Sequence, residues 1–450
     1  MLPIRRRILT LALPVVASSL LERMVQIVDI FLVGGLGAEA IASVGLSQLL
    51  VFFALNLLAG LTMGATIMVA QLWGAKRHRE AARFASQSLL IGALGAAVLS
   101  VLGIALGLPV ARWLGATPGM LALMDRYLLI IFSLFLFTFI VDQLIAIMHG
   151  AGDTRTPMVA IIIVNVLHVA IAYPLIYGHW GAPALGVDGA ALAIGLSEAV
   201  GAVYLFGKAR AQGHVDVTVL RRPLNVDMAS ARHIFRMGFP ITIDRLLQQT
   251  SQIAYTKVIL SYGAVVYAAH QVGLSIEALS FMPGNGFAIA AATAVGQSTG
   301  AQKLAKAKIE NWEANRLAVI LMTGMGLVFF FFPYLLLRAF TTDAAVLAYG
   351  TLFLKIVALL QIPLAITMVV SGSLKGAGDT RFLMTVTVIG AWLVRVPAAV
   401  LCVTLGLTIG WVWAVMVLDW TVRMALVVRR YRSERWHPPQ DSPLSGTPGG

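Results

Sequence analysis

Uninterrupted apolar runs of about 20 residues constrain this chain more than any other feature of its sequence. Two examples are LLIGALGAAVLSVLGIALGLPVA at 89–111 and LAVILMTGMGLVFFFFPYLLL at 317–337. Backbone groups cannot stay unpaired in hydrocarbon, so such runs must be helical, whereas a membrane barrel would show alternating runs of about 10 residues. Only 12% of the 450 residues are charged and 59% are hydrophobic, against about a quarter charged in soluble domains. The sequence predicts an all-α polytopic membrane protein.

Twelve segments are apolar and long enough to cross a bilayer. They lie at 8–34, 41–72, 84–107, 120–147, 157–177, 186–207, 234–259, 265–296, 312–334, 345–372, 382–405 and 408–429. We therefore expect two six-helix lobes, 1–207 and 234–429, joined by a polar connection at 208–233. The Pro/Gly/Ser-rich tail at 430–450 is expected to be disordered. The first segment resembles a signal peptide, but it continues to Gly34, which favours a retained helix.

The Lys and Arg residues predict the direction of the spans. The chain carries a formal net charge of +13, and most of its basic residues fall in segments that share one side if twelve spans alternate. By the positive-inside rule that side is cytoplasmic, which places both termini, the 208–233 connection and the tail in the cytoplasm of a bacterial inner membrane. The positive charge is thus explained by topology, and nucleic-acid binding is not expected.

An internal repeat divides the chain in two. The hexapeptide GAGDTR occurs at 150–155 and again at 376–381, and we call the separation of these two copies the repeat offset. The same offset joins Pro14 to Pro240, Gly37 to Gly263, Gln71 to Gln297 and Met158 to Met384. Six spans per half give both halves the same orientation, so we expect the substrate path between them. In GAGDTR itself, glycine permits a tight turn and the Asp can cap the following helix.

These features resemble the multidrug and toxic compound extrusion (MATE) transporters. The resemblance rests on VDIFLVGGLG at 28–37, YGAVVYAAHQ at 262–271, FMPGNGFAIAAATAVGQSTGA at 281–301 and the doubled GAGDTR, and it extends over about residues 8–430. It implies two lobes around a V-shaped central cavity. It also implies a secondary antiporter that exports bulky, cationic or amphipathic small molecules in exchange for H⁺ or Na⁺. A monomer without cofactor or metal is expected.

The first span carries a polar stripe. Ser19, Glu22, Gln26 and Asp29 recur at steps of three and four and so share one helical face. The repeat offset places Arg245, Gln248, Gln252 and Tyr255 at the equivalent positions of the seventh span. We interpret Gln26, Gln248, Gln252 and Tyr255 as candidates for the lining of a water-filled cavity. The alternative is a polar seam between helices.

Asp29 is the leading candidate for coupling. Burial disfavours an ionised carboxylate, so Asp29 can hold a proton, release it on exposure to the other side, and alternate with a cationic substrate. The resemblance supports this interpretation, because Asp29 matches the aspartate of the first helix that the family uses for cation coupling. Glu22 is a second candidate, although an ion pair with Arg23 or Arg245 would explain it equally well.

The fifth span departs from the family pattern. Many bacterial members carry Asn-x-x-Asn-x-x-x-Asp there, whereas this chain has Asn165, His168 and Ala172. Loss of a carboxylate weakens a Na⁺ site, and an imidazole titrates near neutral pH. We therefore predict H⁺ coupling, with His168 near Asp29 as a relay and Asn165 beside it. The alternative for His168 is a packing residue in a helix seam.

Other intramembrane acids are weaker candidates for the cavity. In the NorM branch of the family, acids of the second half stand at the positions of Gln248 and Leu364. Because this chain has no acid at either position, Glu277 is the acidic candidate that remains in its second half. Asp142 is a candidate in the first half.

Several function classes lack their sequence signals. There is no phosphate-binding G-x-x-x-x-G-K-[ST] loop, no H-E-x-x-H, no Cys/His cluster and only one cysteine, so we expect no ATP hydrolysis, resident metal or other enzyme activity. The remaining alternative is a flippase for a lipid-linked saccharide from the wider two-lobe superfamily. A flippase would be expected to carry a cluster of intramembrane basic residues for the pyrophosphate.

Overall fold

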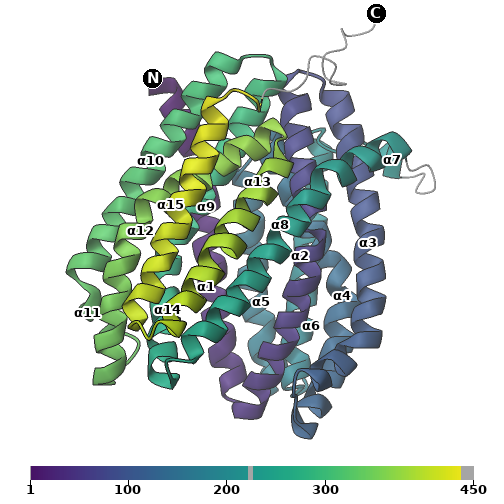
Figure 1. The fold of residues 1–450 in the computed structure, drawn as a ribbon. Coiled ribbons are helices and arrows are strands. Elements are labelled where there is room, and N and C mark those ends of the chain that lie inside the picture. The colour runs from purple at the N-terminus through teal and green to yellow at the C-terminus, as the bar shows by residue number, and fades with distance from the viewer. Residues whose placement is uncertain (1, 221–226, 437–450) are drawn as a thin grey trace, which may run out of the picture. The chain divides into compact units, whose positions relative to one another are not determined.

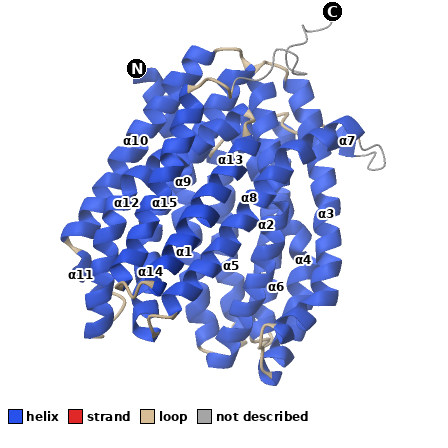
Figure 2. Cartoon of the chain, in the orientation of Figure 1, coloured by secondary structure: helices blue, strands red, loops and turns tan. Residues whose placement is uncertain are grey.

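The structure is a computed structural model that describes residues 2–220 and 227–436, and Figure 2 shows helices and loops throughout the described part. The first half contains α1 (Leu2–Gly34), α2 (Ala38–Gly74), α3 (His78–Trp113), α4 (Pro118–Ala151), α5 (Arg155–Tyr177), α6 (Val187–Ala211) and α7 (Val217–Leu220). The second half contains α8 (Met228–Leu260), α9 (Ala264–Gly300), α10 (Leu304–Phe331), α11 (Pro333–Arg338), α12 (Ala344–Ala377), α13 (Thr380–Thr387), the π-helix η1 (Val388–Arg395), α14 (Val396–Thr404) and α15 (Ile409–Arg432). Figure 1 labels these elements.

Eleven helical segments in the described residues are long and apolar enough to cross a membrane. One of them, Thr380–Thr404, combines α13, η1 and α14. The one predicted span not among them, 234–259, corresponds to α8, which is 33 residues long but is not apolar enough to be counted with the others. Its middle carries the sequence DRLLQQTSQ at 244–252, so α8 has the length of a span with a polar centre.

The chain forms two compact units. Unit 2 contains Ala17–Thr242, and unit 1 contains Met1–Val16 together with Ile243–Gly450. The boundaries therefore fall inside α1 and α8 and not in the connection between the predicted lobes. The repeat offset relates one boundary to the other. Each follows a helix proline, Pro14 or Pro240, closely.

Unit 2 is built around α4, which packs against α2, α3 and α6. Small residues allow these helices to approach closely. A Cβ at Gly92 would lie 2.2 Å from the Phe139 ring, and a Cβ at Gly195 would lie 2.2 Å from Leu134. The aromatic and aliphatic side chains of α4 therefore fill the space that the glycines of α3 and α6 leave.

Unit 1 is centred on the pair α9 and α12, which pack along their length (Figure 1). A Cβ at Gly372 or Gly376 would lie 2.2 Å from the backbone oxygen of Ala288 or Ala292, respectively. The beginning of α1 belongs to the core of this unit, because its apolar side chains are buried there. These side chains are Ile8, Leu11 and Ala12.

A buried ion pair fixes the beginning of α1 within unit 1. Arg7 pairs with Glu310 of α10, whose side chain is fully buried. Glu310 also accepts a hydrogen bond from Ser298 at 2.5 Å, and Arg7 donates to Gln297 at 2.6 Å. A buried carboxylate needs such partners, so the first turns of α1 are held by charge as well as by apolar packing.

The two GAGDTR copies form the predicted turns. Gly152 and Gly378 both have φ near 92°, which glycine adopts without steric cost. Asp153 Oδ1 accepts hydrogen bonds from the backbone N–H groups of Arg155 and Thr156 at 3.1 and 3.0 Å, so the first copy caps α5 as expected. In the second copy Asp379 instead binds Arg430 of α15 at 2.6 Å.

The connection and the tail are partly helical. Within 208–233, α6 continues to Ala211, α7 forms one short turn and α8 begins at Met228, while residues 221–226 lie outside the described part. Beyond α15, Trp436 is 2% exposed and its ring stacks on Tyr431 at 4.9 Å. The remainder of the predicted disordered tail, 437–450, also lies outside the described residues.

The positive φ of Gly152 predicts that a side chain at this position lowers the stability of the protein. We expect Gly152→Ala to lower the free energy of unfolding by about 1–2 kcal/mol, because an L side chain is strained in this region. The control is Gly207→Ala in α6, where a Cβ meets nothing within 4 Å and helix propensity makes alanine neutral or stabilising. Thermal unfolding of the purified protein in detergent measures both. Equal midpoints for the two variants would contradict the prediction.

The stability that Asp153 contributes is predicted to depend on pH. Burial opposes ionisation, but hydrogen bonds from Thr156, Gln212 and the backbone of Arg155 outweigh it and lower the pKa of Asp153. The stability that Asp153 contributes is therefore complete above the ordinary carboxyl pKa of about 4 and is lost as pH falls through the lowered value. The difference in unfolding midpoint between wild type and Asp153→Asn should be constant near neutral pH and shrink in acid. Thr156→Val, which removes one donor, should show part of this dependence.

Candidate functional site

Asp29 and His168 contact each other in unit 2. His168 Nε2 of α5 lies 2.6 Å from Asp29 Oδ1 of α1, 139 residues apart in sequence. The His168 side chain is 6% exposed and that of Asp29 is 33% exposed. The contact brings together the two residues that the sequence analysis placed in one coupling site. One partner is enclosed by protein while the other reaches the surface of the unit.

The register between α1 and α5 is fixed beyond this contact. Tyr177 at the end of α5 donates from its hydroxyl to the backbone oxygen of Leu32 at 2.7 Å. Asn165 lies one turn before His168 on α5, and its side-chain Nδ2 is buried without a hydrogen-bond partner in the described residues. Ala172, one turn beyond His168, is 1% exposed. The face therefore offers an amide and an imidazole but no second carboxylate.

A tyrosine lies near the same site. Tyr127 of α4 is fully buried, and its hydroxyl accepts a hydrogen bond from Gln48 Nε2 of α2 at 3.1 Å. Asp29 interacts electrostatically with Tyr127. Sequence reasoning missed both Tyr127 and Gln48, because neither is charged and only the fold brings α2 and α4 close to the end of α1.

Two other members of the α1 stripe lie at the surface of unit 2. Glu22 and Gln26 are exposed, and Arg23 donates to Gln26 Oε1 at 3.0 Å. Arg23 uses its guanidinium on the amide of Gln26, which is not the Arg23–Glu22 ion pair considered as an alternative.

Glu22 belongs to a group of three acids from three helices. Asp142 of α4 and Glu198 of α6 interact with it through like-charge repulsion. Glu198 Oε2 is buried and has no hydrogen-bond partner in the described residues. Sequence reasoning missed Glu198, although a glutamate inside the apolar run AIGLSEAVGAVYL was a signal. Nowhere in the described residues do three or more His, Cys, Asp or Glu side chains converge closely enough to hold a metal ion.

The predicted residues of the second half lie in unit 1 and differ in exposure. Gln248 is exposed, and Gln252 accepts a hydrogen bond from Arg395 at 3.3 Å. Tyr255 is fully buried in the apolar core and donates to the backbone oxygen of Val412 at 2.8 Å. Glu277 is 8% exposed and is attracted by Arg395. Tyr255 thus has the surroundings of a core residue, while Gln252 and Glu277 face one guanidinium.

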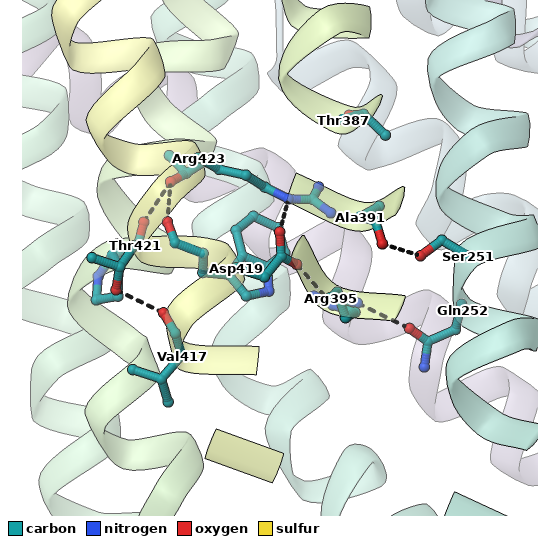
Figure 3. A network of polar contacts seen from close by, with 12 residues as sticks. Ser251, Gln252, Thr387, Ala391, Arg395, Val417, Asp419, Thr421 and Arg423 are labelled. Atoms are coloured by element: carbon teal, nitrogen blue, oxygen red, sulfur yellow. Dashed lines mark hydrogen bonds and ion pairs between the residues drawn. The ribbon is translucent and has the colours of Figure 1, made fainter. Parts of the chain in front are cut away.

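The guanidinium of Arg395 belongs to a buried ion network in unit 1 (Figure 3). Asp419 of α15 is fully buried between two arginines. Its Oδ2 lies 2.7 Å from Arg395 Nε, and its Oδ1 accepts from Arg423 Nε at 2.6 Å. Close by, Thr387 donates to Asp244. Asp419 and Arg423 were not among the residues predicted from the sequence, although their spacing of four residues in an apolar span was a signal.

Comparisons with known proteins agree with this architecture. A family model described as MatE matches residues 14–174 and 240–401, once in each half. The chain is 30% identical over 439 residues to the probable multidrug resistance protein NorM of Thermotoga maritima, covering 96% of this chain and 93% of the relative. It is 26% identical to the probable multidrug resistance protein YoeA of Bacillus subtilis, covering 86% and 84%.

Solved structures share the fold at low sequence identity. The Vibrio cholerae MATE transporter VcmN in its bent form has a TM-score of 0.88 at 19% identity and covers 97% of this chain and 99% of its own. An outward-facing multidrug resistance MATE family transporter of the MOP superfamily has a TM-score of 0.85 at 21% identity, covering 97% of both chains. The family match in both halves and the NorM relative show that this polytopic membrane protein belongs to the MatE family, the multidrug and toxic compound extrusion transporters.

Proposed function

We propose that the protein is a multidrug efflux antiporter that exports cationic or amphipathic small molecules in exchange for H⁺. The observation that carries this proposal is the contact between Asp29 and His168. An acid and an imidazole at hydrogen-bond distance inside a membrane protein form a group that can hold a proton and pass it on.

The geometry of the pair suits exchange between a proton and a cation. Asp29 is a third exposed and can meet an organic cation, whereas His168 is enclosed and can keep the proton within the unit. When Asp29 is ionised it attracts the positive charge of a substrate, and when it is protonated that attraction is lost. Proton and substrate then compete for one carboxylate, which is the linkage that an antiporter needs.

The surroundings of the pair favour H⁺ over Na⁺. Sodium, like other hard cations, is best held by several oxygen ligands. The α5 face presents the imidazole of His168 and the methyl group of Ala172 to this part of unit 2. Asn165 supplies the one amide oxygen of this face, so the pair has few of the oxygen ligands that would hold Na⁺.

The cargo and the location follow from the relatives and the sequence. The names of the NorM and YoeA relatives describe multidrug resistance, which supports a small-molecule drug cargo for this chain. We place the protein in a bacterial inner membrane, with both termini cytoplasmic by the distribution of basic residues, as a monomer that uses no cofactor.

The proposed function predicts proton release driven by substrate. In proteoliposomes with an internal pH dye, added ethidium should drive proton movement with the wild type. Asp29→Asn should reduce the signal to that of protein-free liposomes, because an amide cannot exchange a proton. The control is Asp125→Asn, which removes an exposed acid near the beginning of α4 and should behave as wild type.

Two results would contradict this proposal in different ways. Normal activity of Asp29→Asn would remove Asp29 from the coupling site and leave the acids around Glu22 as its replacement. Exchange driven only by a Na⁺ gradient, with no proton movement, would reject the choice of H⁺.

The proposed function also predicts energetic coupling between Asp29 and His168. A double-mutant cycle of Asp29→Asn and His168→Gln, read by thermal unfolding below the ordinary histidine pKa, should give a coupling energy of about 0.5–1 kcal/mol, since Asp29 is partly exposed. The matched cycle replaces Asp29→Asn by Glu22→Gln, two helical turns away at about 10 Å. That cycle should be additive, and a coupling as large as that of Asp29 would mean that the measured energy is not specific to the contact.

A further inference from the structure

The buried face of α5 has a counterpart in the segment α13–η1–α14 of unit 1. The repeat offset relates buried residues at the beginning of the two segments, including the first two pairs given next, and in the following two pairs the separation is one residue longer. The pairs are Ile161 with Thr387, Val164 with Gly390, His168 with Arg395, and Ala172 with Ala399. One residue has therefore been inserted between Gly390 and Arg395, and with that insertion Arg395 is the equivalent of His168.

The π-helix explains the inserted residue. In η1, which spans Val388–Arg395, hydrogen bonds close on the fifth residue along the chain instead of the fourth. Each such turn holds one residue more than an α-turn, so the helix absorbs an insertion without losing its direction. The consequence is that a side chain at 395 takes the place that 394 would have in a regular helix.

The last helices of the two units support the same alignment. One common offset relates Ser197 and Gly201 of α6 to Asp419 and Arg423 of α15, and all four residues are buried. A Cβ at Gly201 would lie 2.4 Å from Val164. A Cβ at Gly390, the counterpart of Val164, would lie 2.4 Å from Arg423. The same contact between two helices therefore occurs in both units. In unit 2 the glycine is on α6, and in unit 1 it is on η1, the counterpart of α5.

The partner of Arg395 is the equivalent of Asp29. The repeat offset leads from Asp29 to Tyr255, which lies on α8 as Asp29 lies on α1. The Arg395 guanidinium carbon lies 5.6 Å from the centroid of the Tyr255 ring. The two units therefore make the same side-chain contact at the same place: a carboxylate with an imidazole in unit 2, and an aromatic ring with a guanidinium in unit 1.

Polar groups on three neighbouring helices face Arg395 in unit 1. Asp419 of α15 is its ion-pair partner, and Gln252 of α8 accepts from its Nη1. Glu277 and His270 of α9 interact with it electrostatically. Arg423 uses the other oxygen of Asp419. The carboxylate of this site is thus supplied by α15, and the positive charge by the guanidinium.

We propose that Arg395 is a tethered cation that permanently fills, in unit 1, the position where unit 2 takes up its exchangeable proton. This inference rests on the proposed function of Asp29 and His168. A guanidinium does not deprotonate in proteins, so unit 1 carries a copy of the coupling site that takes no part in proton exchange. Only unit 2 then contributes protons to each cycle.

The experiment counts protons released when a substrate binds. Purified full-length protein is held in weakly buffered detergent solution with a pH dye, ethidium is added, and the protons released per bound ethidium are measured between pH 6 and 7.5, about the histidine range. Arg395→Lys keeps the charge and should give the wild-type count. Arg395→His rebuilds a titratable imidazole beside a carboxylate, and its count should rise, up to about twofold if the second site titrates fully.

The matched control is Arg338→His, which introduces the same imidazole at an exposed position of unit 1 and should keep the wild-type count. An unchanged count in Arg395→His, with normal ethidium binding and a monodisperse elution profile, would overturn the proposal. Asp29→Asn tests the underlying function separately. If it releases protons as wild type does, the proposed coupling site fails whatever Arg395 does.

A second variant covers the case in which Arg395→His does not fold. Tyr255→Asp places an acid at the equivalent of Asp29, and the guanidinium should pair with it and keep it ionised. We expect no added proton release from this variant. A raised count would show that the position is open to proton exchange in spite of Arg395 and would overturn the proposal.

Discussion

The cost of placing charge inside a membrane governs the polar structure of this protein. An ionisable side chain in a span must be paired, protonated or brought to the surface. Each unit shows a different solution. Arg7 and Glu310 tie the first turns of α1 to unit 1, Asp419 is enclosed by two arginines, and Asp29 reaches the surface of unit 2 while its partner His168 remains buried. The apolar packing of the spans provides the frame, and these contacts decide which polar groups it can contain.

The two units share a contact between equivalent helices but have different side chains in it. In unit 2 the contact between the first and fifth helices joins a carboxylate and an imidazole, the pair to which we assign proton exchange. In unit 1 the corresponding contact involves Arg395, whose charge is permanent, and the arginine is held by an acid from α15. A duplicated half-chain has thereby kept its helix packing while the chemistry at the shared position has diverged. Changes at a few side chains and one inserted residue are sufficient for this.

Much of the fold could be predicted from the sequence, because apolar length and the internal repeat are properties of the chain itself. The segments of the spans, the turns at Gly152 and Gly378 and the cap by Asp153 are all of this kind. The proximity of Asp29 and His168 followed from their helical positions combined with the family resemblance. The network around Asp419 was missed, because a charged residue in the middle of an apolar span does not reveal which side chains of other helices it will meet. The π-helix had no local signal, and only a change in the repeat offset after Gly390 reveals it.

The division of α1 and α8 between the units has a consequence for how such a protein can arise and fold. The core of unit 1 contains Ile8, Leu11 and Ala12 from the beginning of the chain, and unit 2 extends to Thr242, beyond the first half. Neither half of the sequence contains the whole of one unit. A single half-length ancestor would have completed its core only by exchanging its first half-helix with a second copy. During synthesis the ribosome likewise makes residues 228–242 of unit 2 after the first half, and α9 and α10, which hold Arg7 of α1, are made later still.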